Sequence, residues 1–475
     1  MLQRYLKIAV LAFVMSALPK MYSMEKSMPI PVSTAGQINT LLEAHKKMGN
    51  FSGAVLVVNH GKILISKGYG LANYELDVPN KPIMKFRIAS LTKQFTAAAI
   101  LLLQEKGLLK ITDSLQKYIP DFPHAQSITL HQLLCHASGI PNITFFSDFS
   151  QKCMFAITLD KEIEYIKEHS QSLDFVPGTQ YTYSNSNYLI LSFIVQKVSG
   201  QSFESYLDTQ VLQPLGMTHS GLDHQSKILP NRASGYVKNE GTLANAPFFD
   251  FSWAAGSGGM FSTIEDMYRW DRALFSDKQN VFPSGILQEI IKPHIAISKG
   301  KLGMAYGYGI AVHNDSNETW FSHEGNIQGF SAYMAHYQSD DSSIIVLSNF
   351  AFSPYKTIAK NIRAILTGKS YTLPSQKKSC ILKAEILQKY AGTYELQAVE
   401  DIYKRPAVTI TIRAEKDHLT MIMKNKQQIL LPSSETDFFI KTSNASIHFE
   451  VDSDKKVTGL IMLQNEEVTP GIKVG

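Results

Sequence analysis

Ser90 and Lys93 are the residues of this sequence whose types and spacing best suit chemistry. They lie near the start of residues 86–106, which we predict to be one helix, because the run from Thr96 to Leu103 is apolar on every face. Residues three apart share a helix face, so the amine reaches the hydroxyl. A lysine held neutral by burial can take the serine proton and create a nucleophile. The helix start would favour negative charge developing beside Ser90.

The Ser-x-x-Lys spacing by itself is not specific. The Ser90 copy alone opens a long apolar helix, where a lysine without a partner would be costly. Most other copies lie in polar or loop-like stretches. These copies are Ser23/Lys26, Ser114/Lys117, Ser298/Lys301, Ser353/Lys356, Ser375/Lys378 and Ser453/Lys456. The surrounding sequence therefore selects Ser90 and Lys93.

Tyr183-Ser-Asn185 is a second candidate and the only Tyr-x-Asn in the chain. We predict a loop here that runs into a helix from about residue 188 to 199. Loops in such positions present side chains to a cleft. The ordinary alternative is a tyrosine that packs with its hydroxyl in water.

His323-Glu-Gly325 is a third candidate, placed at the end of a predicted strand. Another His-x-Gly occurs at His219, so this motif is weak alone. No metal site or cofactor is predicted, because His131 and His136 are off metal-ligand register and fit polar groups at a helix end. The three cysteines are expected to be buried free thiols rather than metal ligands. They are Cys135, Cys153 and Cys380.

The elements that must position these residues come from both ends of the sequence. Alternating or apolar runs predict roughly six antiparallel strands, and a helical region of about 200 residues separates the first two from the rest. We therefore expect an α+β fold, with an antiparallel sheet, an all-helical lobe and the Ser90 helix between them. The predicted strands are 53–58, 62–68, 308–313, 318–323, 329–337 and 343–348.

The C-terminal region reads differently. After a linker near residue 372, one short helix around 384–390 is followed by short strands separated by turn residues. This pattern predicts a small all-β barrel or sandwich. We divide the chain into residues 1–23, 24–371 and 372–475.

The composition indicates the structural class of the protein, and the first residues predict its localisation. A hydrophobic content of 44%, a charged content of 18% and a net charge of +5 are typical of a globular protein. No basic face with interleaved aromatics is evident, so nucleic acid is not an expected partner. Arg4 and Lys7 precede the apolar run 8–18, which predicts a signal peptide over 1–23 and a periplasmic or secreted protein. An uncleaved segment that associates with the membrane is the alternative.

The three motifs, in this order and with these gaps, resemble those of the penicillin-recognising serine hydrolases, and most of all the class C β-lactamase-like branch. The resemblance covers about residues 35 to 365, and the tail with Tyr-Ala-Gly-Thr-Tyr at 390–394 is similar to the lipocalin-like domain often appended in this family. Further segments support it: 133–141, 176–179, 214–217 and 258–263.

The resemblance implies a role for each motif residue. Ser90 would be acylated, with Lys93 and Tyr183 sharing the proton transfers. The identity of the base is disputed in related enzymes, so we assign that role to the pair. Asn185 would hold Lys93 and the substrate amide. The N–H groups of Ser90 and Asn326 would form the oxyanion hole, beside Gly325 and His323 in the substrate-binding wall.

One departure from the family pattern bears on the substrate. His323 stands where β-lactamases carry a lysine, and histidine is largely neutral at pH 7. The resemblance therefore implies an esterase or D-amino-acid peptidase, on a small-molecule or peptidoglycan-derived substrate, rather than an efficient β-lactamase. Two alternatives stay open: a penicillin-binding or cell-wall-sensing protein that is acylated with little turnover, and an inactive scaffold.

Overall fold

The computed structural model describes most of the chain. It describes residues 33–474 apart from 240, 277–280, 284, 298–302, 316–317, 376–377, 398–406, 424–425, 441–444 and 465–466. The predicted signal peptide at 1–23 lies outside the described residues. Among the helices that the structure does describe, none has the length and apolar character needed to cross a membrane.

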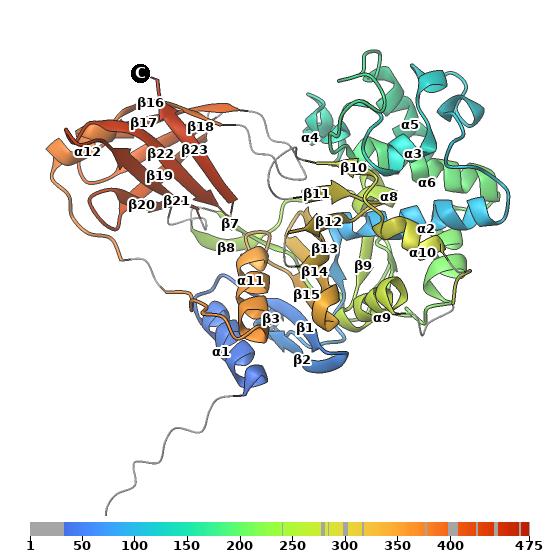
Figure 1. Ribbon diagram of the computed structural model, residues 1–475, viewed down its shortest axis with the longest axis horizontal. Coiled ribbons are helices and arrows are strands. Elements are labelled where there is room, and N and C mark those ends of the chain that lie inside the picture. The colour runs from blue at the N-terminus through green and yellow to red at the C-terminus, as the bar shows by residue number, and fades with distance from the viewer. Residues whose placement is uncertain are drawn as a thin grey trace, which may run out of the picture.

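An antiparallel sheet of eight strands, ordered β10-β11-β12-β13-β14-β15-β1-β2, forms the centre of the molecule (Figure 1). The predicted α+β class is confirmed, and the first hairpin pairs with the last strand of the sheet through β1 and β15. The two strands that we did not predict, β10 and β11, are short. The strands are β1 Gly53–Asn59, β2 Lys62–Tyr69, β10 Ile295–Ala296, β11 Gly303–Tyr306, β12 Ala311–Asn314, β13 Thr319–Ile327, β14 Phe330–Tyr337 and β15 Ser342–Ser348.

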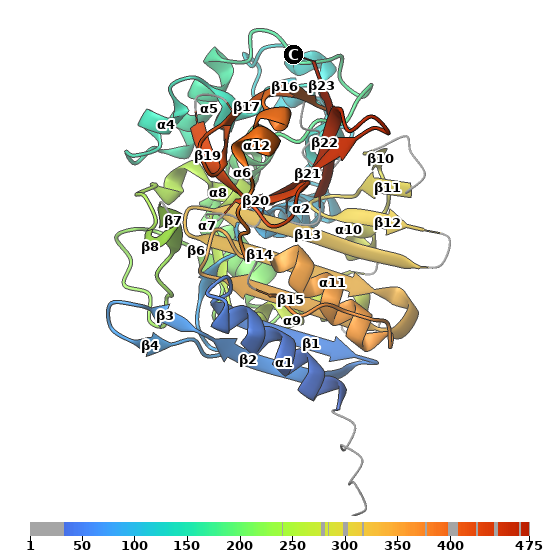
Figure 2. The same ribbon diagram turned by 90° about the vertical axis from the view of Figure 1, so that its left-hand side faces the viewer.

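Both faces of the sheet are covered, which explains why its strands are apolar on both sides. Along β1, Val55 and Val57 pack with the core under α1 (Thr34–Lys47) and α11 (Tyr355–Leu366), which lie across one face (Figure 2). The alternate residues, among them Leu56, belong to the larger core on the other face. This larger core also contains the helical lobe.

The central helix α2 (Thr92–Glu105) is buried from Thr92 to Leu103, as its all-round apolar sequence predicts. The prediction of one helix over residues 86–106 was wrong at its start. Phe86–Arg87 is the short strand β5, paired with β9 (Met260–Ser262), and Ala89–Leu91 is a 3₁₀ turn, η1. Ser90 therefore lies on the 3₁₀ turn that joins a strand to the helix.

The helical lobe packs on α2 through α6, whose first residue is Asn185. Its elements are α3 Leu130–Leu134, α4 Phe149–Lys152, α5 Leu159–Glu168, α6 Asn185–Ser199, α7 Phe203–Leu207 and α8 Ala255–Gly258. The glycine-rich segment 256–259 was predicted to be a tight turn, and this was wrong, because residues 256–258 belong to the short helix α8. This helix contacts both α2 and α6.

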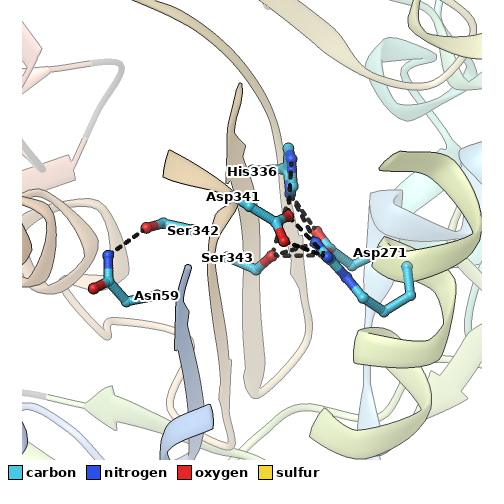
Figure 3. Close-up of polar contacts among 7 residues, drawn as sticks. Asn59, Asp271, His336, Asp341, Ser342 and Ser343 are labelled. Atoms are coloured by element: carbon cyan, nitrogen blue, oxygen red, sulfur yellow. Dashed lines mark hydrogen bonds and ion pairs between the residues drawn. The ribbon is translucent and has the colours of Figure 1, made fainter. Parts of the chain in front are cut away.

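A buried polar cluster ties α9 (Ile264–Phe275) to the sheet (Figure 3). Ser343 Oγ donates to Asp271 Oδ2 at 2.6 Å, and the His336 Nδ1 atom lies 3.3 Å from Asp271 Oδ1. Although serine, histidine and aspartate meet here, all three are buried and the hydroxyl is committed to the carboxylate. The cluster therefore has a structural role, which is to hold α9 against the sheet.

The C-terminal unit is a closed antiparallel barrel, so the predicted small all-β unit is confirmed as a barrel. Its core is mostly aliphatic and also contains aromatic rings, with Tyr390 of α12 (Ala384–Tyr390) stacked on Phe449 at a centroid distance of 4.4 Å. Its eight strands are β16 Gly392–Leu396, β17 Val408–Ala414, β18 Leu419–Met423, β19 Lys426–Pro432, β20 Asp437–Ile440, β21 Ala445–Val451, β22 Val457–Gln464 and β23 Glu467–Lys473.

The cysteines are free thiols, as expected. Cys135 and Cys153 are buried, but Cys380 is exposed, so the expectation of burial was wrong for that residue. It lies in the segment that joins the two domains, outside both cores.

Candidate active site

The nucleophile candidate Ser90 is held by the close approach of β13 to the η1 turn. Gly325 makes this approach feasible, since a Cβ at that position would lie 2.4 Å from the Ile88 carbonyl oxygen and 3.0 Å from the Ser90 nitrogen. Ala89, just before Ser90, has a φ of +46°, a conformation that non-glycine residues rarely adopt. The turn therefore presents Ser90 in a defined orientation.

The Lys93 side chain is completely buried, with 0% exposure, and three oxygens surround its amine. Its Nζ lies 3.2 Å from Ser90 Oγ, 2.8 Å from Asn185 Oδ1 and 2.6 Å from the Ser257 carbonyl oxygen. Among the residues that the structure describes, no carboxylate forms an ion pair with it, so burial lowers the Lys93 pKa well below the ordinary value. The amine is thereby biased toward its neutral form.

Tyr183 lies beside the same two groups, in the segment that precedes α6. The Lys93 amine is 4.7 Å from the centroid of the Tyr183 ring. Burial raises the pKa of the Tyr183 phenol, while its hydrogen bond with Ser90 acts in the opposite direction. The structure thus brings Tyr183 together with Ser90 and Lys93, which precede it in the sequence by about 90 residues.

Asn185 is oriented by Asn142, a residue that we did not single out. Asn142 Oδ1 accepts hydrogen bonds from the Asn185 backbone nitrogen at 3.1 Å and from Asn185 Nδ2 at 3.3 Å. This fixes the amide so that its oxygen faces Lys93. The Ser257 carbonyl was also missed, and no side-chain pattern could have indicated it, because it acts through the backbone.

We predicted His323 at the end of a strand, but it lies within β13. Its Nδ1 donates to the Glu324 carbonyl oxygen at 2.7 Å, so the neutral ring accepts at Nε2 from the Tyr306 hydroxyl at 2.9 Å. Burial is the largest cause that lowers the His323 pKa, to about 3. A substrate would have to displace Tyr306 to bond this ring directly.

A cavity of about 480 Å³ has Ser90 in its wall, whereas Lys93, Tyr183 and His323 are not among its lining residues. Ser90, Asn185 and Asn326 contribute polar groups to its wall, and Gly325 lies directly before Asn326. The remaining wall is mostly apolar and comes largely from two segments, 142–160 and 236–256. Its apolar residues include Ile143, Phe149, Val237, Phe249, Trp253, Ala254 and Ile327.

Metal binding finds no support in the part of the chain that the structure describes, where no group of three or more histidine, cysteine or acidic side chains could hold an ion. The site itself offers hydroxyl, amine, phenol and amide groups. A partly exposed serine beside an amine biased toward its neutral form is suited to nucleophilic attack on a carbonyl carbon.

Such a site on this α+β fold defines the serine hydrolases that include β-lactamases and penicillin-binding proteins. A family described as Beta-lactamase matches residues 38–368, and the chain belongs to this family. Residues 376–471 match a second family, described as a domain of unknown function (DUF3471). These matches do not specifically establish the class C branch or a lipocalin-like tail.

Three relatives illustrate the range of similar proteins. Penicillin-binding protein 4* of Bacillus subtilis is 29% identical over 88% of this chain and 94% of its own length. The octameric penicillin-binding protein homologue from Pyrococcus abyssi has a TM-score of 0.65 at 23% identity, covering 92% of this chain and 99% of that one. The D-amino acid amidase from Ochrobactrum anthropi has a TM-score of 0.60 at 19% identity, covering 71% and 99%. The last two likenesses concern the fold.

Proposed function

We propose that this chain is an exported serine hydrolase that forms an acyl-enzyme on Ser90. Its substrate would be an ester, a D-amino-acid peptide or amide, or a β-lactam-like amide. The observation that carries the proposal is the buried Lys93 amine, 3.2 Å from Ser90 Oγ and without a carboxylate partner, beside a cavity of about 480 Å³.

The hydrogen bonds of Lys93 support its role as a base. A neutral amine carries two hydrogens and one lone pair. Its contacts with Asn185 Oδ1 and the Ser257 carbonyl use both hydrogens, because those oxygens can only accept. The lone pair then faces Ser90 Oγ and can receive the hydroxyl proton as the oxygen attacks the carbonyl carbon.

Tyr183 suits the transfer of that proton to the leaving group. Burial raises its pKa, which keeps the phenol protonated at neutral pH, so it would donate one proton while receiving another from Lys93. The N–H groups of Ser90 and Asn326 would bind the oxyanion, and Asn185 would orient the substrate. Attack by water on the acyl-enzyme would release the acid and restore Ser90.

The state of His323 bears on the choice of substrate. A neutral, doubly hydrogen-bonded imidazole supplies no fixed positive charge at the third motif, where β-lactamases carry lysine. This favours esters and D-amino-acid amides over β-lactams, and the fold shared with a D-amino acid amidase is consistent with that preference.

Export rests on the sequence pattern at 1–23 and is tested by determining the N-terminus of the mature protein.

The test is hydrolysis of p-nitrophenyl butyrate and D-phenylalanine amide by the native protein and by Ser90→Ala and Ser114→Ala. Ser114 belongs to another Ser-x-x-Lys, is not among the residues that line the cavity, and is a matched control. We expect turnover in the native protein and in Ser114→Ala, with loss in Ser90→Ala. Equal turnover by Ser90→Ala would exclude the proposal.

A non-turnover role is the second candidate, favoured by the similarity to penicillin-binding protein 4* along almost the whole chain. It predicts that a fluorescent penicillin labels Ser90 and that the label persists for hours. An inactive scaffold predicts no Ser90-dependent labelling by penicillin or fluorophosphonate.

A further inference from the structure

A second pocket, of about 560 Å³, adjoins the catalytic cavity. Phe249 and Gln328 line both spaces, so the two share part of their walls. In contrast to the apolar catalytic cavity, this pocket has two arginines in its wall, Arg87 and Arg232. We call it the arginine pocket.

The two arginines share one buried carboxylate. Arg87 Nε donates to Asp223 Oδ2 at 2.6 Å and Arg232 Nη1 donates to Asp223 Oδ1 at 2.8 Å, while the Asp223 side chain is only 1% exposed. Two positive charges against one negative charge leave the wall with an excess of one. Lys227, also in the wall, is 3.6 Å from Glu204 and does not change this balance.

The guanidinium groups retain free donors. Among the residues that the structure describes, each arginine side chain makes its hydrogen bond only to Asp223, through one nitrogen, so the other N–H groups are available. Arg87 is also fixed in place, since its Cζ atom lies 3.6 Å from the centroid of the Phe251 ring. A planar, immobilised set of N–H donors with excess positive charge suits a carboxylate.

Only a short stretch of chain separates Arg87 from Ser90. Arg87 precedes Ser90 by three residues, so their Cα atoms are separated by at most about 11 Å, the length of a fully extended chain. A substrate acylated at Ser90 could therefore place an acidic group in the arginine pocket across a short linear spacer.

We propose that the arginine pocket binds a carboxylate that the substrate carries away from its scissile bond. The preferred substrates would then be esters or amides with an acidic group several bonds from the reacting carbonyl. This inference rests on the proposed function, because it specifies the substrate of the same serine. It would also give the protein a positive subsite that its third motif, with a neutral His323, does not provide.

The experiment uses p-nitrophenyl monoesters of pimelic, suberic and sebacic acid, each compared with the fatty-acid ester of the same chain length. The measured quantity is the ratio of kcat/KM for the acidic ester to kcat/KM for the neutral ester. We expect at least one ratio to exceed about tenfold in the native protein, as charge-assisted hydrogen bonds would give. Added salt should lower it.

Variants locate the effect. Arg232→Met should reduce the ratio about tenfold. Arg232→Lys should reduce it less, because lysine keeps the positive charge but lacks the planar, two-pronged N–H donors of the guanidinium group. Arg269→Met is the matched control: Arg269 also binds a buried aspartate, Asp266, at 2.6 Å, but it does not line the pocket. This control should leave the ratio unchanged. Fluorophosphonate titration gives the concentration of folded, reactive enzyme for each variant.

The outcomes separate the two proposals. If the native ratios are near one, or if Arg232→Met retains a high ratio, the arginine pocket does not bind the substrate and the proposed hydrolase function still stands. If Ser90→Ala hydrolyses both esters as fast as the native protein, the proposed function fails and this inference fails with it.

Discussion

Ser90/Lys93 and Ser114/Lys117 have the same spacing and very different surroundings. Ser114 caps the turn η2 (Leu115–Lys117), and its hydroxyl donates to the Ala125 carbonyl oxygen at 2.7 Å. The Lys117 side chain is 55% exposed and pairs with Asp113 at 2.8 Å. Lys93, by contrast, is fully buried and reaches its serine. The difference shows that desolvation, and not spacing, prepares an amine to act as a base.

Replacing the two serines should give the largest contrast. We expect Ser90→Ala to lower kcat/KM for p-nitrophenyl butyrate by about 10⁵-fold, since loss of a nucleophile removes the covalent route. Ser114→Ala should instead lower the free energy of unfolding by about 1 kcal/mol through loss of a cap. Steady-state kinetics and urea unfolding measure the two effects. A comparable kinetic loss in both variants would contradict this contrast.

Replacing the two lysines should give the next largest effect. Lys93→Met should lower kcat by roughly 10²- to 10⁴-fold, the usual contribution of a general base. Lys117→Met should leave kcat unchanged and alter stability by less than about 1 kcal/mol, because exposed ion pairs contribute little. Single-turnover acylation rates, with thermal unfolding as the folding control, test this. A fully active Lys93→Met would assign the base to another group.

The pH dependence sharpens the comparison further. Lys93 accepts a proton only when neutral, so kcat/KM should rise with pH and then level off. Because burial lowers its pKa, the plateau should begin well below about pH 10.4, where an ordinary lysine titrates. His323, with its pKa lowered to about 3, should add no inflection between pH 5 and 8. A rise that continues to pH 10 would indicate a charged Lys93 at neutrality.

The smallest effect is expected from a change to the hydrogen bonds that support the Ser90/Lys93 pair. The Ser114/Lys117 pair, as the structure describes it, lacks such support. Asn142→Ala removes the acceptor that orients Asn185, so we expect about a tenfold loss of kcat, as for one hydrogen bond. The control is Asn59→Ala, which removes a 2.9 Å hydrogen bond to Ser342, and neither residue lines the catalytic cavity or the arginine pocket. Equal kinetics in both variants would mean that Asn185 needs no such support.

The sequence predicted the architecture where its periodicity was strong. The early hairpin, the apolar helix α2 and the barrel strands follow from alternation or from a continuous apolar run. The failures are local. Residues 86–91 resemble a continuation of α2, but pairing of β5 with β9 and the η1 turn override that preference. Strands as short as β10, with two residues, carry no measurable alternation.

The sequence predicted which side chains form the site, but not all of the hydrogen bonds that connect them. The motifs identified Ser90, Lys93, Tyr183 and Asn185, which the structure brings together. The roles assigned to them, and to Gly325 and Asn326, stay predictions. Contacts made by the Ser257 carbonyl and by Tyr306 depend on how distant segments pack, and no local pattern in the sequence reports such packing.

The pairing of β1 with β15 has a consequence for how the chain folds. Gly53 pairs with Ser348. The first strand of the early hairpin, β1, therefore cannot complete its pairing until a strand almost 300 residues later has been made. Closing so long a loop before any contact rewards it makes folding slow. Until that partner is available, β1 has an unprotected edge that invites association with other chains. The nascent polypeptide should therefore depend on holding factors until nearly the entire catalytic domain has been synthesised.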